Sequence, residues 1–275
     1  MLPAQATPGR MSLLESDTKM PRGGTGPGGA PPETRTAETR AAARLGYWIA
    51  IAVSVLTVVS FGLAMTALPD RVPYPFTDPV IAEQWPGDYL WLFPAMVLML
   101  AFVALAAAVH VWAPASRKVF SLVALCLSAI AAAVLLGDYF VQATVIQPSL
   151  EKGQLDGWAM LTMYNPNGVF IALEEAGYLL MSLALVCLVP VYAGGGRVER
   201  AVRWLFAASF VAVVLALVAV SAVRGSDRGD TFEIAVISIV WLTLIAAGPL
   251  LAAAFRRSAA ATPGEGPRDH GGIPA

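Results

Sequence analysis

Six long runs of apolar residues, separated by short polar segments, organise this chain. They lie at about residues 47–68, 89–112, 119–146, 169–192, 201–223 and 232–255. Each run has roughly 20 residues or more, the length at which an α-helix crosses about 30 Å of hydrocarbon. A segment inside lipid must satisfy its own backbone polar groups, and the runs do not alternate with the period of a membrane barrel. We therefore predict an all-α fold, a polytopic transmembrane bundle of six helices.

Composition agrees with this prediction. Hydrophobic residues make up 57% of the chain and charged residues only 13%, which differs widely from the average soluble domain. We therefore expect the lipid bilayer to be a partner of the protein. The net charge of −1 argues against a nucleic-acid partner. Usage rich in Arg and Ala is common in high-GC bacterial genomes, so we expect a multi-pass protein of the bacterial cytoplasmic (inner) membrane.

The two ends of the chain differ from its middle. Residues 1–40 and 258–275 are rich in Pro, Gly and small polar residues, a composition that buries too little apolar surface to fold. We therefore predict a disordered cytoplasmic tail at 1–40, a six-helix transmembrane domain at 41–257 and a second disordered cytoplasmic tail at 258–275.

Basic residues are distributed unevenly among the segments between the runs. When these segments are counted alternately, 14 of the 18 Lys and Arg residues fall on the side of the two termini. The other side holds Arg71, Lys152, Arg224 and Arg228. Because Lys and Arg are enriched in cytoplasmic loops, both termini are predicted to be cytoplasmic.

The densest set of polar residues inside the apolar runs lies in the third and fourth runs. Asp138 and Gln142 share one helix face, because residues four apart are neighbours on a helix. Glu174 and Glu175 lie at a similar depth, about 8–12 Å below the outer boundary, and Tyr178 shares a face with Glu174. Antiparallel neighbours joined by one loop bring their loop-proximal turns together. We therefore expect Asp138 and one of the two glutamates to face each other.

A carboxylate in the acyl region must face the bundle interior, be paired or be protonated. We expect Arg224, which ends the fifth run on the same side, to be the cationic partner, with Arg71 and Arg228 as weaker candidates. Residues 152–164 are expected to form a short amphipathic cap in the outer interface. Glu233, at the start of the sixth run, is expected to be a surface group.

Two interpretations of this cluster remain open. The first is a binding or transport site for a small ligand, an ion or a proton; its residues would be Asp138, Gln142, Glu174, Glu175, Tyr178 and Arg224. The second is a structural or accessory membrane protein in which the cluster only holds helices together.

The middle third of the chain resembles six-helix bacterial integral membrane proteins to which no activity is assigned. The residues that carry the resemblance are Asp138, Tyr139, Gln142, Pro148, Asn165, Pro166, Asn167, Gly168, Glu174, Glu175, Gly177 and Tyr178. The resemblance implies the fold and the membrane and supplies no reaction.

Motifs that would indicate an enzyme are missing from the sequence. The chain contains no HExxH, GxSxG or CxxC motif and no phosphate-binding P-loop, and no Lys lies within the six runs. Only His110 and His270 are present, and the second falls in a predicted tail, which argues against a bis-histidine haem. We therefore expect no catalytic residues, no metal site and no cofactor, and we favour a binding or structural protein over an enzyme.

Overall fold

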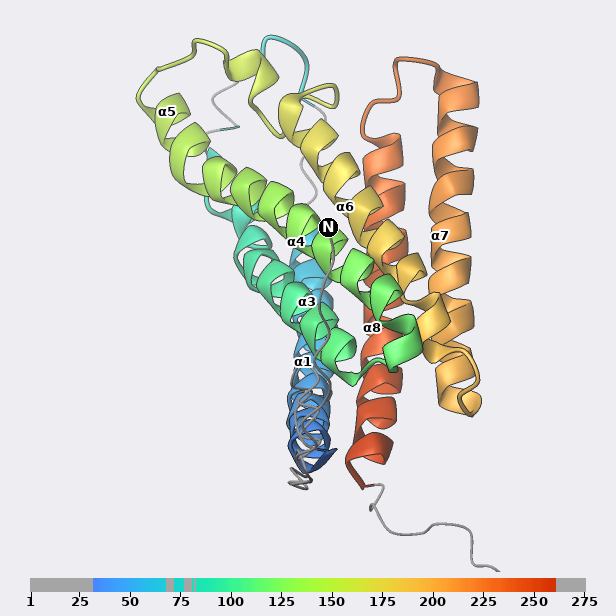
Figure 1. Cartoon of the computed structure of the whole chain (residues 1–275). Coiled ribbons are helices and arrows are strands. Elements are labelled where there is room, and N and C mark those ends of the chain that lie inside the picture. Colours follow the sequence, from blue (N-terminus) through green and yellow to red (C-terminus); the bar gives the residue numbers. More distant parts are fainter. Residues whose placement is uncertain (1–31, 68–71, 77–80, 82, 261–275) are drawn as a thin grey trace, which may run out of the picture.

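The computed structural model describes residues 32–67, 72–76, 81 and 83–260, and within these ranges it contains no strand (Figure 1). The long helices are α1 (Pro32–Thr66), α3 (Leu92–Trp112), α4 (Lys118–Val141), α6 (Val169–Cys187), α7 (Arg197–Arg224) and α8 (Thr231–Ala260). Short helical segments precede, extend or join them: η1 (Gly87–Tyr89), η2 (Ala115–Arg117), η3 (Gln142–Ile146), α5 (Gln147–Glu151), η4 (Trp158–Met160) and η5 (Val189–Tyr192). Among the described residues, six helical segments are long and apolar enough to cross a membrane, as the sequence predicts.

The first and last helices reach into the predicted tails. Helix α1 begins at Pro32 and α8 ends at Ala260, so residues 32–40 and 258–260 are helical. The remainder of both predicted tails, residues 1–31 and 261–275, lies outside the described residues.

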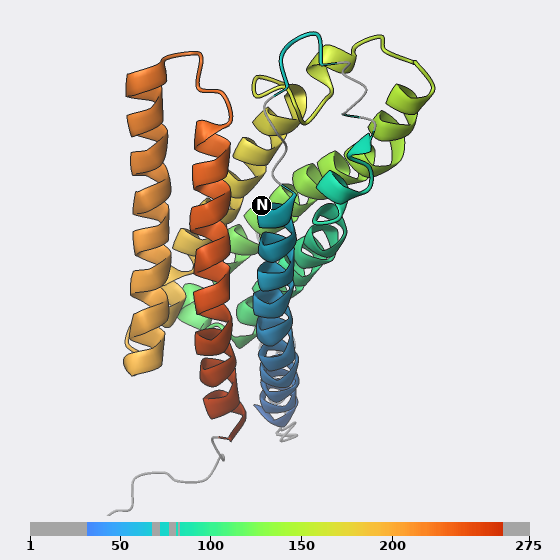
Figure 2. The same cartoon turned by 180° about the vertical axis from the view of Figure 1, so that it is seen from behind.

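Five of the long helices form a closed ring. Each neighbouring pair in the order α1, α3, α4, α6, α8 and back to α1 is in contact, and α7 packs outside the ring against α8 and α6. The start of α1 and the end of α8 lie together at one end of the bundle (Figures 1 and 2). We call this the inner end. The opposite end carries residues 72–76, 152–168 and 225–230, and we call it the outer end.

Small residues allow close packing between the helices. Gly248 of α8 lies against α1, where an added Cβ would stand 2.7 Å from the Ala50 carbonyl oxygen and collide with the Ser54 side chain. The next residue, Pro249, has no N–H to offer the Ile245 carbonyl one turn earlier. Ser54 Oγ donates a hydrogen bond to that carbonyl at 2.9 Å. The α1–α8 contact therefore satisfies the acceptor that the proline leaves free.

The helix of the third run continues beyond its predicted end at Ile146. Helix α4 passes into the single π-helical turn η3 and then into α5, so the helical path ends at Glu151. Pro148, which lacks an N–H, comes directly after this wide turn. Turns of this kind are frequent at functional sites, and Gln142 is the first residue of η3.

The segment predicted as an amphipathic cap contains one short 3-10 turn, η4, and is otherwise irregular. Its Trp158 is buried and donates a hydrogen bond from Nε1 to the Phe76 carbonyl oxygen at 2.6 Å. Trp158 and Phe76 belong to a small apolar cluster that also contains Ile146 and Phe170. The segment thus packs on another loop at the outer end, and its position in the membrane interface stays a prediction.

Candidate functional site

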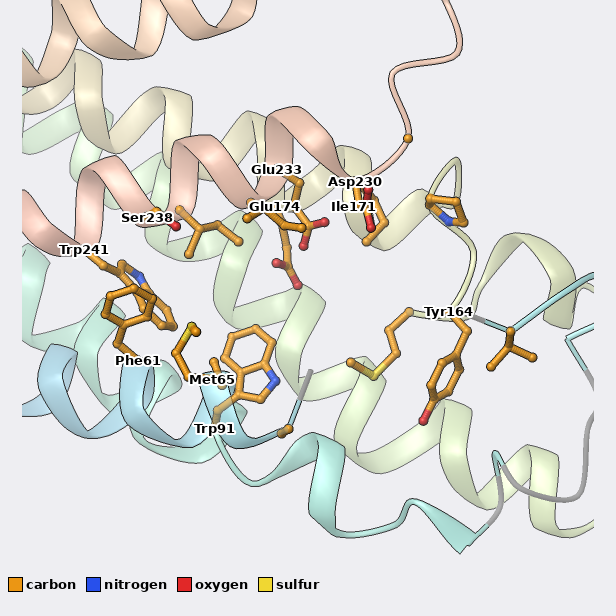
Figure 3. A pocket seen from close by; sticks show the side chains of 18 of the residues that line it. Phe61, Met65, Trp91, Tyr164, Ile171, Glu174, Asp230, Glu233, Ser238 and Trp241 are labelled. Atoms are coloured by element: carbon orange, nitrogen blue, oxygen red, sulfur yellow. The ribbon is translucent and has the colours of Figure 1, made fainter. Parts of the chain in front are cut away.

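A cavity of about 430 Å³ lies at the outer end of the ring, among α1, α3, α6 and α8 (Figure 3). Its acidic and basic lining residues are Glu174, Arg224, Asp227, Asp230 and Glu233. Its aromatic and sulfur-containing lining residues are Phe61, Met65, Trp91, Met163, Tyr164 and Trp241. Because Arg224 and Asp227 are exposed, the cavity reaches the surface at this end of the bundle.

Glu174 of α6 and Glu233 of α8 meet inside this cavity. Figure 3 shows their carboxyl groups directed toward each other, and they lie within hydrogen-bonding reach. The Glu174 side chain is 3% exposed, and its Oε2 has no hydrogen-bond partner among the described residues. Since two ionised carboxylates are acceptors only, a proton or a cation is needed between them.

Asp138 and Gln142 of the third predicted run lie directly behind this pair. The Gln142 amide nitrogen donates to Asp138 Oδ2 at 3.2 Å and contacts Glu174 Oε1 at 3.5 Å. The predicted approach of Asp138 to one of the two glutamates is therefore confirmed, with Glu174 as the partner and Gln142 as the bridge. Asp138 is 3% exposed and does not line the cavity.

A chain of buried hydrogen bonds connects the floor of the cavity to α4. Trp241 Nε1 donates to the Tyr178 hydroxyl at 2.9 Å, and the Tyr178 and Tyr139 hydroxyls are 2.8 Å apart. Trp91 packs edge-on against both Tyr139 and Trp241, with ring centroids 5.2 and 6.0 Å apart. These contacts hold the rings of Trp91 and Trp241 in place at the cavity wall.

Glu175, the residue after Glu174 in α6, has a different partner. Glu175 Oε2 accepts a hydrogen bond from Arg228 Nη2 at 2.8 Å, and this is the only salt bridge among the described residues. The expectation that Arg224 neutralises the carboxyl cluster is therefore wrong, because the loop after α7 carries Arg228 to Glu175. Arg224 lines the cavity without an ion pair at salt-bridge distance, and Arg71 lies outside the described residues.

The mouth of the cavity is completed by residues of the loop before α6. Tyr164 lines it and donates a hydrogen bond from its hydroxyl to Asp88 Oδ2 at 2.8 Å. Burial raises the pKa of Tyr164 well above its ordinary value, and the neighbouring Tyr89 and Asp88 raise it further. The Tyr164 hydroxyl therefore stays protonated and acts as a donor. Asn165 closes a turn in the same loop, where its Oδ1 accepts a hydrogen bond from the Asn167 N–H at 3.0 Å.

The structure divides the predicted site residues into three groups. Glu174 and Arg224 line the cavity; Asp138, Gln142 and Tyr178 lie behind it in hydrogen-bond networks; Glu175 is occupied by its ion pair.

The expectation that Glu233 is a surface group is wrong, because Glu233 is half-buried and faces Glu174 inside the cavity. The sequence contained an indication that Glu233 faces the same side of its helix as Trp241, because residues four and eight apart share a helix face. That face of α8 carries Glu233, Ile237 and Trp241, all of which line the cavity.

Within the described part of the chain, no group of three or more His, Cys, Asp and Glu side chains is arranged to hold a metal ion. Comparisons with protein families, with curated proteins and with solved structures found no match to this chain. These comparisons therefore give no support to the resemblance of the middle third of the chain to six-helix bacterial membrane proteins.

Proposed function

We propose that this chain is a multi-pass membrane protein whose outer-end cavity binds a small positively charged species, a cation or a proton, between Glu174 and Glu233. Six helices of sufficient length and apolarity support the membrane assignment. The uneven distribution of Lys and Arg supports cytoplasmic termini, and thus an outward-facing cavity in a bacterial inner membrane.

The observation that carries this proposal is the state of Glu174. Its side chain is almost completely buried, its Oε2 lacks a donor among the described residues, and the Glu233 carboxyl is directed toward it. Burying an acceptor without a partner costs about 1–3 kcal/mol, and more for a charged group. A bound cation or proton would remove this cost, whereas a site with no occupant would retain it.

A structural role is the second candidate, and the position of Asp138 favours it. Asp138 and Gln142 lie outside the cavity lining and bridge α4 to α6. The Tyr139–Tyr178–Trp241 chain likewise joins three helices by hydrogen bonds. Such networks are known to set helix pairing in membrane bundles. In this alternative the cavity would be empty space left by the network.

Intrinsic fluorescence of the protein in nanodiscs can test the proposal, because Trp91 and Trp241 line the cavity. The spectrum would be followed while pH and the concentration of sodium or potassium chloride are varied. We expect a saturable change in the unaltered protein and in a Glu151→Gln control, which removes an exposed carboxyl at the outer end. The double variant Glu174→Gln with Glu233→Gln should lose this fluorescence change. An unaltered response in the double variant would contradict the proposal and favour the structural role.

A further inference from the structure

The lining of the cavity combines a negative charge excess with aromatic walls. Four of its described lining residues are acidic, namely Glu174, Asp227, Asp230 and Glu233, and one is basic, Arg224. Arg228, the next cation along the chain, is held by Glu175. The potential inside the cavity therefore favours a positively charged occupant over an anion or a neutral molecule.

Three of the aromatic lining residues, Phe61, Trp91 and Trp241, lie on one side of the carboxyl pair. Trp241 comes two helical turns after Glu233 in α8, about 12 Å along the helix axis. Phe61 and Trp91 stand edge-on to Trp241, with ring centroids 5.6 and 6.0 Å from it. Figure 3 shows these rings on one side of the Glu174–Glu233 pair and Asp230 on the other. Aromatic faces attract cations and also bury apolar groups.

The volume of the cavity indicates what size of cation could fill it. About 430 Å³ falls in the range of sites for small organic ligands, about 300–1,000 Å³. A proton or a bare alkali ion would fill a small fraction of this space and, held at the carboxyls, would leave most of the aromatic surface without a contact. An amine with an apolar body would place its charged group beside the two carboxyls and its body against the rings.

We infer that the physiological ligand is an organic cation, a protonated or quaternary amine with an aromatic or aliphatic body of modest size. This inference rests on the proposed function and narrows it to one chemical class. Besides the acidic cluster itself, its support is the unpartnered and almost fully buried Glu174 oxygen directed into a cavity with aromatic walls. Glu174 and Glu233 would neutralise the charged group, and Phe61, Trp91 and Trp241 would contact the body.

Calorimetric titration of the purified protein with four probes would test this inference. Phenylethylamine and benzyltrimethylammonium carry both a charge and a ring, 2-phenylethanol lacks the charge, and tetramethylammonium lacks the ring. We expect the first two to bind, and each of the others to bind at least about 10-fold more weakly, because one of the two interactions is lost. Equal binding of 2-phenylethanol, or no binding of either ringed cation, would overturn the inference.

Variants of the lining residues, compared with a control variant outside the cavity, would locate the binding site of the amine. Glu233→Gln should weaken binding of phenylethylamine about 10- to 100-fold, as expected when a charged hydrogen-bond partner is removed, and Phe61→Leu should weaken it less. Glu151→Gln should bind as the unaltered protein does. Glu233 is only half-buried, so we expect Glu233→Gln to fold. This variant can therefore be measured even if Glu174→Gln does not fold. Undiminished binding in Glu233→Gln and Glu174→Gln would place the amine elsewhere and overturn the inference.

The two proposals fail in different ways. If pH or alkali cations change the fluorescence through Glu174 and Glu233 while neither ringed cation binds, the proposed function stands and the organic-cation inference is wrong. If neither response occurs, both are wrong.

Discussion

The inner and outer halves of the bundle differ most in how closely their helices pack. Buried polar atoms without a partner among the described residues occur in both halves, and those near the inner end include the Tyr192 hydroxyl and Arg203 Nε. In the inner half, Ser54 donates to the Ile245 carbonyl, and Thr243 Oγ1 donates to Ser209 Oγ at 2.9 Å. A void between the helices there has a volume of about 10 Å³. In the outer half, oxygens of Asp138 and Glu174 have no partner among the described residues, and the cavity measures about 430 Å³.

This difference indicates which half is built for stability. Close packing and satisfied acceptors lower the free energy of the folded state. Unpartnered buried oxygens beside a large cavity raise it, and such arrangements persist where a ligand or another function requires them. Figure 2 shows α1 beside α8 through the inner half, where Gly248 lies against α1. We therefore expect substitutions in the two halves to affect different properties of the protein.

The largest expected effect concerns the exposure of the two ends to opposite sides of the membrane. In a background with Cys126 and Cys187 changed to Ala, a single cysteine at position 151 should react with an impermeant thiol reagent added outside intact cells. A cysteine at position 117 should react only after the cells are opened, because basic loops remain cytoplasmic. Labelling of position 117 and protection of position 151 in intact cells would reverse the assignment of inner and outer ends.

A paired glycine substitution tests the packing of the inner half. Gly248→Ala should lower the free energy of unfolding by about 1–3 kcal/mol, because the added Cβ overpacks the contact with Ser54 and Ala50. Gly62→Ala in α1 is the control, since nothing lies within 4 Å of its added Cβ, and it should be neutral or stabilising by up to about 1 kcal/mol. Thermal unfolding in detergent measures both. Equal shifts for the two variants would contradict close packing at Gly248.

Amide substitutions separate the cavity from the network behind it. Glu174→Gln should leave stability unchanged or raise it by about 1 kcal/mol, because it removes repulsion between facing carboxylates, and should abolish the response to cations or protons. Asp138→Asn should largely preserve that response, since Asp138 does not line the cavity. Thermal unfolding and fluorescence titration of the same samples report both properties. Loss of the response in Asp138→Asn alone would make Asp138 the binding group.

The smallest expected effect is at the ion pair of the outer end. Arg228→Met should lower stability by about 1 kcal/mol or less, because the Arg228 side chain is 33% exposed and partly exposed pairs contribute little. Arg224→Met is the matched control and should leave stability unchanged, since Arg224 forms no salt bridge with the described residues. Chemical unfolding would compare the two variants, and a larger loss in Arg224→Met would restore Arg224 as the cationic partner.

The amino-acid sequence by itself determined the six helices and the approach of Asp138 to one of two glutamates, Glu174 or Glu175. Length and apolarity dictate helices that span lipid. Helical periodicity places Gln142 one turn after Asp138, and a single connection between antiparallel helices brings their adjoining turns together. These features depend on local geometry and short connections, so they are readable from a linear pattern.

Only the tertiary structure decided that Glu233 faces Glu174, that Arg228 and not Arg224 pairs with Glu175, and that a cavity separates α1 from α6. Each of these depends on the rotation of α8 about its axis and on its packing against α6 and α1. That rotation is set by contacts such as Gly248 against α1, which join residues about 200 positions apart. In lipid both faces of a helix can be apolar, and the hydrophobic pattern therefore does not reveal which face turns inward.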